Sequence, residues 1–206
     1  YVALTNPVAL AVDAAGNVYV LRNDQVDVVD TGKNVTTYVG SAPINNATNP
    51  NGDGLPAANC RLTNPRGMML GPSGELFIAD SGRDLIRLIS PGGTLTSTAA
   101  GGGAPAYPSV GDGGPALAAS LNNPSGVTLD PAGTRLLIAD TNNHRIRAVD
   151  LASGTISTIA GTGTAGFSGD GDVAATALVN FPIKIMRSGP AGVFADSGNN
   201  RIRKII

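Results

Sequence analysis

The sequence predicts an all-β fold, a β-propeller built from repeated four-stranded blades, and three observations lead to this prediction. First, a short motif that ends in proline returns four times, and its prolines lie 58, 59 and 58 residues apart (Pro7, Pro65, Pro124 and Pro182). Second, every repeat contains short runs of apolar or β-branched residues between Gly, Asn, Pro and Asp. Third, no helical apolar period is present. A fixed period of this length indicates a repeat architecture, and four short strands per repeat are typical of a propeller blade.

The chain divides into four repeats, which we expect to form a single propeller, or a segment of one, over residues 1–206. The repeats cover residues 4–61, 62–120, 121–178 and 179–206. The first three hold four expected strands each, whereas the fourth ends after its third strand. Six blades at this period would need about 350 residues, so the number of blades in the closed ring stays open.

Each expected strand has a local justification. The first follows the proline as an apolar run, and a Gly turn separates it from the second. A polar turn leads to the third strand, and the fourth is rich in Thr and other β-branched residues, which favour strands. First strands are expected at 8–13, 66–70, 125–130 and 183–187, and second strands at 18–21, 76–79, 136–139 and 193–195. Third strands are expected at 26–29, 85–89, 145–149 and 201–205, and fourth strands at 35–39, 95–99 and 156–160.

A Gly-Asp-Gly sequence marks the long connection after each fourth strand, with its aspartate at Asp53, Asp112 or Asp170. Its glycines permit a tight turn with positive φ, and Pro115 suits the first position of a short helix expected over residues 116–121. The aspartates indicate either an Asx turn with a helix cap or, at Asp170 and Asp172, a calcium site. Calcium needs more oxygen ligands at close spacing than two carboxylates supply, so the structural interpretation is favoured and no cofactor is expected.

The composition argues against several classes of partner. Only 14% of the residues are charged and the net charge is −1, so nothing attracts nucleic acid by bulk electrostatics. No apolar run approaches the roughly 20 residues of a membrane helix, so membrane insertion is not expected. The single cysteine excludes a disulfide within the chain.

The motifs resemble those of the NHL repeat family of β-propellers. The resemblance rests on Asn123-Pro124-Ser125-Gly126-Val127, on Leu137 to Arg147 (Leu-Ile-Ala-Asp-Thr-Asn-Asn-His-Arg-Ile-Arg), on Ile156 to Gly161 and on the Gly-Asp-Gly linkers, which are similar to those of bacterial NHL and teneurin-like repeats. The first repeat departs, because Leu21-Arg22 replaces the Ala-Asp pair. Membership of this family implies a propeller, commonly six-bladed, that is mostly used for binding. A minority of such propellers are enzymes, such as peptide-amidating lyases or lactonase-like relatives.

An aspartate and an arginine recur seven residues apart in three repeats, as Asp80 and Arg87, Asp140 and Arg147, and Asp196 and Arg203. One interpretation is a ring of charge that binds a ligand. The favoured one is a structural ion pair between blades, because a charge on a third strand is expected to be buried and a buried arginine must be paired.

Few other residues carry recognisable chemistry. His144 is the only histidine and is expected to face solvent in a turn, Glu75 is the only glutamate, and Cys60 is expected to be a half-buried filler residue. These counts exclude a three-histidine zinc site or a pair of catalytic glutamates within the chain. Asn34 and Asn46 each begin a glycosylation sequon, which matters only in a source that glycosylates.

These observations favour a non-catalytic binding or scaffold module, extracellular or at the cell surface, that binds a protein or carbohydrate on its loop face. The first alternative is a structural subunit of a surface assembly or filament, joined through open blade edges such as residues 201–206. The second is part of a larger lyase- or lactonase-like propeller enzyme, whose metal ligands lie outside this chain.

Overall fold

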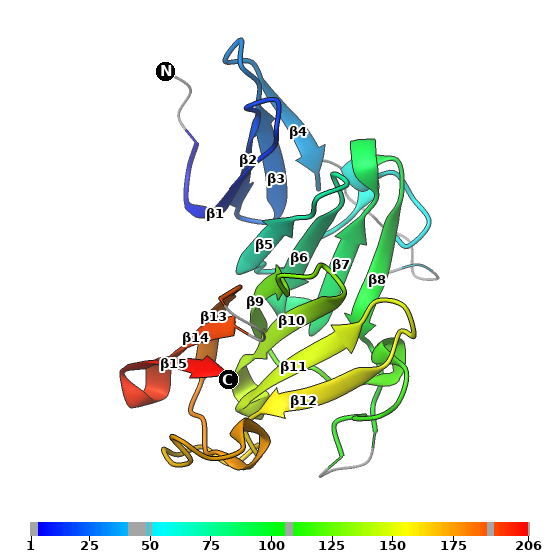
Figure 1. The fold of residues 1–206 in the computed structure, drawn as a ribbon. Coiled ribbons are helices and arrows are strands. Elements are labelled where there is room, and N and C mark those ends of the chain that lie inside the picture. The colour runs from blue at the N-terminus through cyan, green and yellow to red at the C-terminus, as the bar shows by residue number, and fades with distance from the viewer. Residues whose placement is uncertain (1–3, 41–48, 50, 106–108, 189–191, 206) are drawn as a thin grey trace. The chain divides into compact units, whose positions relative to one another are not determined.

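The computed structural model describes residues 4–40, 49, 51–105, 109–188 and 192–205. Its strands form four antiparallel sheets, which follow one another along the chain (Figure 1). Blade 1 contains β1 (Pro7–Val12), β2 (Val18–Arg22), β3 (Gln25–Val29) and β4 (Val35–Val39), and blade 2 contains β5 (Gly67–Leu70), β6 (Leu76–Asp80), β7 (Leu85–Ile89) and β8 (Thr96–Gly101). Blade 3 contains β9 (Pro124–Leu129), β10 (Arg135–Asp140), β11 (Arg145–Asp150) and β12 (Ile156–Ala160), and blade 4 contains β13 (Pro182–Met186), β14 (Gly192–Asp196) and β15 (Arg201–Ile205). The predicted all-β class with four blade repeats, the last of three strands, is confirmed.

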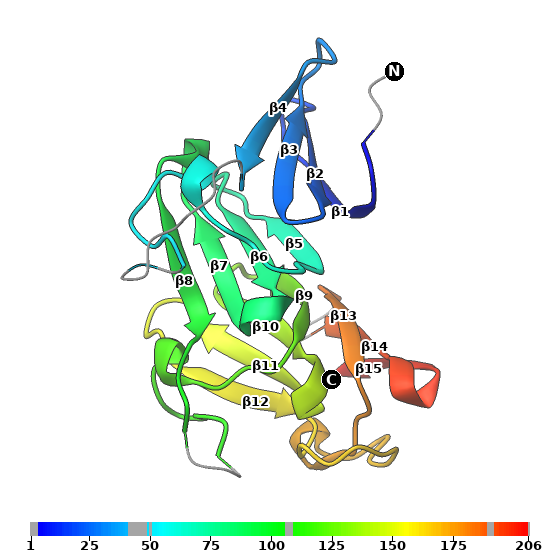
Figure 2. The ribbon, with the colours of Figure 1, turned by 180° about the vertical axis from the view of Figure 1, so that it is seen from behind.

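Each sheet is ordered as its strands are in sequence, as Figure 2 shows from behind. This order follows from short turns, which join antiparallel neighbours directly. By its contacts the chain divides into two units, Tyr1–Ala99 and Ala100–Ile206. The expectation of a single domain over residues 1–206 stays a prediction.

The turn between the second and third strands is built alike in three blades. It is a 3₁₀ turn, η2 (Ser81–Arg83), η5 (Thr141–Asn143) or η7 (Ser197–Asn199), that ends at a left-handed residue, Asp84, His144 or Asn200. Blade 1 has no such 3₁₀ turn between its second and third strands. There Arg22 pairs directly with Gln25 across a two-residue connection. The predicted polar turn between the second and third strands is thus present in these blades, and it brings the ends of the two strands together.

Each unit has its own apolar core. In the first unit, Leu21, Val39 and Cys60 pack with Leu76 and Ile78. In the second unit, one core joins blades 3 and 4, and it includes Leu137, Ala139, Ile146, Val179, Ile185, Phe194 and Ile205. The inner strands of blades 2 and 3 are buried on both faces, because every residue of β6 and β9 is buried and so are the last five residues of β10. Such strands read as continuous apolar runs rather than as an alternation.

The linkers contain less helix than the sequence predicts. The helix expected over residues 116–121 is a single 3₁₀ turn, η4 (Ala116–Ala118), and Pro115 precedes it rather than starting it. The turn stops because Ala119 is extended, with its carbonyl accepting a hydrogen bond from the Gly103 amide at 3.1 Å. Equivalent turns are η1 (Ala57–Asn59) and η6 (Ala174–Thr176). Among the described residues, no helix is long and apolar enough to cross a membrane.

Candidate functional site

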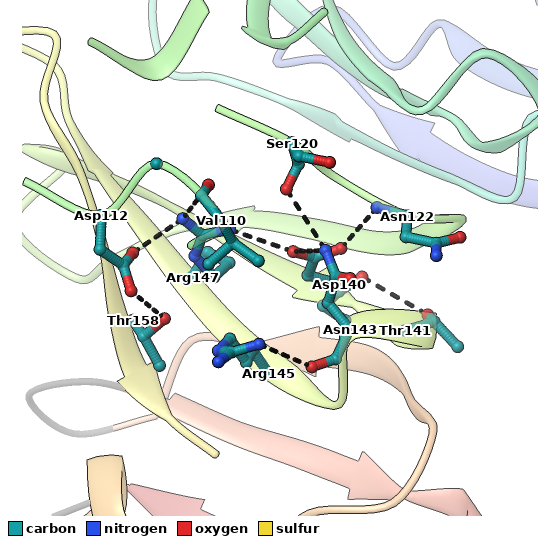
Figure 3. A network of polar contacts seen from close by, with 12 residues as sticks. Val110, Asp112, Ser120, Asn122, Asp140, Thr141, Asn143, Arg145, Arg147 and Thr158 are labelled. Carbon is teal, nitrogen blue, oxygen red and sulfur yellow. Dashed lines mark hydrogen bonds and ion pairs between the residues drawn. The ribbon is translucent and has the colours of Figure 1, made fainter. Parts of the chain in front are cut away.

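Blade 3 contains a buried arginine held between two carboxylates (Figure 3). Arg147, on β11, is 0% exposed, and its Nη1 lies 3.1 Å from Oδ2 of Asp140 at the end of β10. Its Nη2 lies 2.7 Å from Oδ1 of Asp112 in the preceding linker and also donates to the Val110 carbonyl at 3.2 Å. The pair therefore lies within one blade and its linker. The expectation of a pair between blades was wrong, because the antiparallel register places Asp140 and Arg147 near each other on adjacent strands.

The strand aspartate also holds two neighbouring loops. Oδ1 of Asp140 accepts the Asn122 backbone N–H at 2.8 Å, and its Oδ2 accepts from the Asn143 amide at 2.9 Å. Burial raises the pKa of Asp140, whereas these hydrogen bonds and Arg147 act to lower it. The equivalent backbone bonds run from Thr63 to Asp80 at 2.6 Å and from Asn180 to Asp196 at 2.7 Å. In blades 3 and 4, one carboxylate thus ties the loop before the blade to the turn between its second and third strands.

The linker aspartate reaches the fourth strand as well. Oδ2 of Asp112 accepts the Thr158 hydroxyl of β12 at 2.7 Å, and Asp53 accepts the Thr98 hydroxyl of β8 at 2.9 Å. Neither aspartate caps the turn that follows it, since no side-chain cap is present at η1 or η4. The prediction that the linker aspartates Asp53 and Asp112 cap a short helix was therefore wrong. We define the arginine clamp of a blade as its buried arginine, strand aspartate, linker aspartate and fourth-strand threonine.

The threonines of the clamp did not appear among the sequence candidates. Thr98 and Thr158 occupy the same place in their fourth strands, and this recurrence could have identified them. Their role is not visible in sequence, because the partner of Thr158 lies 46 residues away along the chain.

In the described part of blade 4, the clamp consists of Arg203, Asp196 and Asp170. Nη1 of Arg203 lies 3.3 Å from Asp196, and Nη2 lies 2.7 Å from Asp170. A guanidinium therefore supplies positive charge at the carboxylate considered for calcium. Among the described residues, no group of three or more His, Cys, Asp or Glu side chains comes together to hold a metal ion.

Blade 2 departs from this pattern. The carboxylate partner of Arg87 is Asp53, at 2.8 Å, and no ion pair joins it to Asp80 in the described chain. Asp80 instead has Arg83 at 3.9 Å, in the place where blade 3 has Asn143. Oδ2 of Asp80 accepts no hydrogen bond from the described residues. Burial raises the pKa of this carboxyl from its ordinary value of 3.8 to about 6.

The raised pKa of Asp80 predicts a pH effect on stability. Between pH 4 and 6 the folded chain binds more protons at this carboxyl than the unfolded chain, so its contribution favours folding as the pH falls. We expect the free energy of unfolding of the wild type, relative to Asp80→Asn, to rise by about 1 kcal/mol between pH 7 and pH 5. Urea unfolding of both proteins at the two pH values measures this, and a difference that does not change with pH would contradict it.

Blade 1 carries the same ion pair with its charges exchanged. Asp27 is buried at the position of the arginine on the third strand, and Arg22 stands at the position of the strand aspartate. Asp27 also accepts hydrogen bonds from Gln25 at 2.7 Å and from Thr37 at 3.0 Å. The departure at Leu21-Arg22 is therefore a reversal of polarity. A search for Asp followed by Arg could not find it, although an opposite-charge search would have.

The single histidine and cysteine lie deeper than expected. His144 is half-buried, stacks edge-on against Phe181 with ring centroids 4.6 Å apart, and accepts the Phe181 N–H at Nδ1. Burial lowers its pKa. Cys60 is fully buried in the core of the first unit, and burial raises the pKa of its thiol. The expectations of a solvent-facing histidine and a half-buried cysteine were wrong, because Phe181 lies against His144 and strand residues of the first core surround Cys60.

Of the two glycosylation sequons, the structure describes one asparagine. Asn34 is exposed in the turn between β3 and β4, where its amide donates to Asp30 at 2.8 Å. Asn46 lies outside the described residues.

Exposed aromatic residues gather around the η7 turn of blade 4. Phe167 and Phe181 are 44% and 43% exposed, whereas Phe77 and Phe194 are buried in the cores. Phe181 accepts a backbone hydrogen bond from Ser197 in η7, and Asn199 of the same turn donates to Gly166, next to Phe167. The Arg201 guanidinium lies 4.0 Å from the centre of the Phe167 ring. We call Phe167, Phe181 and Arg201 the aromatic patch.

Residues 121–148, from the start of blade 3 into its third strand, match the family model of the NHL repeat. The third blade carries an NHL repeat. The Arabidopsis thaliana protein SUPPRESSOR OF QUENCHING 1, chloroplastic, is 33% identical over 107 residues, 52% of this chain and 10% of its own length. The Bos taurus NHL repeat-containing protein 2 is 33% identical over 100 residues, 48% of this chain and 13% of its own length. The matched segments are thus about a tenth of these relatives.

Solved structures agree with the NHL propeller fold. A protein of unknown function from Bacteroides thetaiotaomicron has a TM-score of 0.68 at 18% identity, over 94% of this chain and 45% of that one. An auxiliary nutrient binding protein from the same organism has a TM-score of 0.64 at 21% identity, over 92% and 44%. Virginiamycin B lyase from Staphylococcus aureus has a TM-score of 0.59 at 16% identity, over 96% and 51%. At these identities the likeness shows the fold alone, and this chain spans about half of each structure.

Proposed function

We propose that this chain is a non-catalytic binding module, extracellular or at the cell surface, whose ligand is a protein or a carbohydrate. The observation that carries the proposal is the aromatic patch. Exposed aromatic rings supply rigid contact area at low cost in conformational entropy, and an arginine beside them adds hydrogen-bond donors. Apolar rings on the turns of rigid blades are suited to recognition.

The arginine clamps support the same proposal. They place the buried charges of blades 2 to 4 in contacts between a strand, a linker and a loop. Such charges hold the backbone in place, which favours a rigid scaffold for the loops. A nutrient-binding protein among the similar structures is consistent with a binding role.

The test uses the purified chain on an array of immobilised neutral glycans and an array of extracellular proteins. We expect at least one ligand that loses about tenfold or more in affinity with Phe181→Ala, because an interface aromatic contributes more than 1 kcal/mol. Leu151→Ala is the matched control, since Leu151 is 43% exposed in the turn after β11, away from η7. Binding to neither array, or equal losses in the two variants, would contradict the proposal.

A second candidate is a structural subunit of a surface assembly or filament, and a separate observation on blade 1 favours it. Val8, Leu10 and Val12 form an exposed apolar stripe on β1, and Leu10 is 64% exposed. Met68, which follows its proline at the same spacing as Leu10, is buried against the core of the first unit. The outer face of blade 1 thus has the apolar character of a face that packs against another blade.

A further inference from the structure

We infer that His144 is a pH-sensitive switch for Phe181, a residue of the aromatic patch. Protonation of the imidazole breaks the hydrogen bond that holds the Phe181 backbone to blade 3, and the ring of Phe181 then leaves its place in the patch. The effect on ligand binding rests on the proposed function, whereas the effect on Phe181 does not. The inference thus adds a means of regulation to the proposed site.

Phe181 has a backbone conformation that phenylalanine disfavours. The residue before the repeated proline has a positive φ in all four repeats, of 51°, 48°, 52° and 46° in turn: Asn6, Asn64, Asn123 and Phe181. Asparagine tolerates this left-handed region, whereas a bulky residue there is strained and stays only where its surroundings impose the conformation. The contacts around Phe181 must therefore hold its backbone in place.

Hydrogen bonds to two blades hold Phe181. Its carbonyl accepts from the Ser197 amide at 3.3 Å and from the Ser197 hydroxyl at 2.8 Å, both in blade 4. Its own N–H donates to Nδ1 of His144 in blade 3 at 3.2 Å, and the two rings pack edge-on. The next residue, Pro182, is held separately, because its carbonyl accepts the Thr141 hydroxyl at 2.7 Å. Loss of the bond to His144 therefore frees Phe181 without separating the blades.

The junction between blades 1 and 2 uses the same bond with a different acceptor. There the Asn64 amide donates to Oδ1 of Asp24 at 3.1 Å, and Asp24, like His144, directly precedes the third strand of its blade. A carboxyl group can accept a hydrogen bond in both of its protonation states. Nδ1 of histidine accepts only while the ring is neutral, because both ring nitrogens of the imidazolium are donors. The bond to Phe181 therefore depends on pH in a way that the bond to Asn64 does not.

The surroundings of His144 set the direction of this dependence. Burial lowers the pKa of His144, the neighbouring Arg145 on β11 lowers it further, and Asp196 at the end of β14 raises it. The ring is therefore neutral at pH 7 and accepts from Phe181. As the pH falls through a pKa below histidine's ordinary value of about 6.5, a proton on Nδ1 opposes the Phe181 N–H at 3.2 Å. Because the folded-state pKa is lowered, acid removes this contribution to stability.

An NMR titration of the intact chain between pH 7.5 and pH 5 tests the switch without any ligand. His144 is the only histidine, so its ring signals need no further assignment. We expect the Phe181 amide signal to shift with the same midpoint as these ring signals. Its protection against hydrogen exchange, corrected for the intrinsic effect of pH, should fall about tenfold with the loss of one hydrogen bond. The Asn64 amide is the internal control and should show neither change.

Two variants separate the switch from the rest of the patch. His144→Asp is the matched variant, because an aspartate, Asp84, has the corresponding left-handed conformation in blade 2, and Asp24 accepts the corresponding bond in blade 1. It should keep the amide of Phe181 protected at both pH values. Phe181→Asn introduces the residue of the other three repeats and keeps the backbone N–H, so the amide at position 181 should still follow His144.

The arrays of neutral glycans and extracellular proteins measure the effect on binding. Signals that Phe181→Asn removes should be about tenfold weaker at pH 5 than at pH 7.5 for the wild type, because the ring no longer lies in the patch. The same signals should not depend on pH in this range for His144→Asp. Absence of any signal contradicts the proposed function, whereas the NMR titration decides on the switch.

Three results would overturn the inference. They are a Phe181 amide that does not follow the midpoint of His144, an equal fall in its protection in His144→Asp, and array signals that require Phe181 but are the same at both pH values. The first two results would show that His144 does not hold Phe181. The third would show that the position of Phe181 does not regulate binding.

Discussion

Replacing Arg147 by alanine is expected to lower the free energy of unfolding by about 3–5 kcal/mol, because it leaves Asp140 as an uncompensated buried charge. Arg147 is fully buried, and its guanidinium bonds Asp140, Asp112 and the Val110 carbonyl. The loss should shrink as the pH falls, since protonation neutralises a lone buried carboxyl. Urea unfolding at pH 7 and pH 5 measures both effects.

Arg187→Ala is the matched control for this prediction. Arg187 lies just after β13 in the same unit and is exposed, so its replacement should change the free energy of unfolding by no more than about 0.5 kcal/mol. Small and equal effects at the two arginines would show that the clamp contributes little to stability.

Replacing Gly161 by alanine is expected to cost about 3 kcal/mol of stability, from two separate causes. Its φ of +90° strains an L-residue by about 1–2 kcal/mol. In addition, the new Cβ would overlap the His144 carbonyl oxygen, and a backbone atom can move away only by shifting the turn after β10, which typically costs about 1–3 kcal/mol more.

Gly154→Ala separates the two causes. Gly154 also has a positive φ, +70°, but nothing lies within 4 Å of the position where a Cβ would be placed. Its replacement should therefore cost only about 1 kcal/mol. Thermal unfolding of both variants measures the difference, and equal shifts in Tm would mean that the contact with His144 is not strained.

Much of the candidate site was predictable as a pattern but not as a set of contacts. The recurrence of Asp140 and Arg147 at one spacing indicated a buried pair, because local register brings adjacent strands together. The second partner of the arginine, Asp112, lies 35 residues away in a linker, and sequence reasoning assigned it to a turn and a cap. No local rule connects a linker carboxylate to a side chain in the following blade.

The departures have the same origin. Asp80 has a different cationic partner from Asp140, because Arg83 stands in the neighbouring turn where blade 3 has an asparagine. Arg87 therefore pairs with the linker carboxylate of Asp53. In blade 1, Arg22 and Asp27 exchange charges at two facing positions, and the pair survives because only the opposite signs matter. Both changes are readable in the sequence once the facing positions are known.

The sequence by itself determined the period, the strands and their turns, since these depend on residues within one repeat: apolar runs, glycine at positive φ and a proline before each first strand. Only the tertiary structure decided what surrounds each strand. It half-buried His144 against Phe181 and buried Cys60 in a core. It also pointed Ile205 into a core while leaving Ile202 exposed, and it paired Asp170 with Arg203. Burial and ion pairing depend on atoms brought together from different repeats, and their energies are set by that environment rather than by the residues alone.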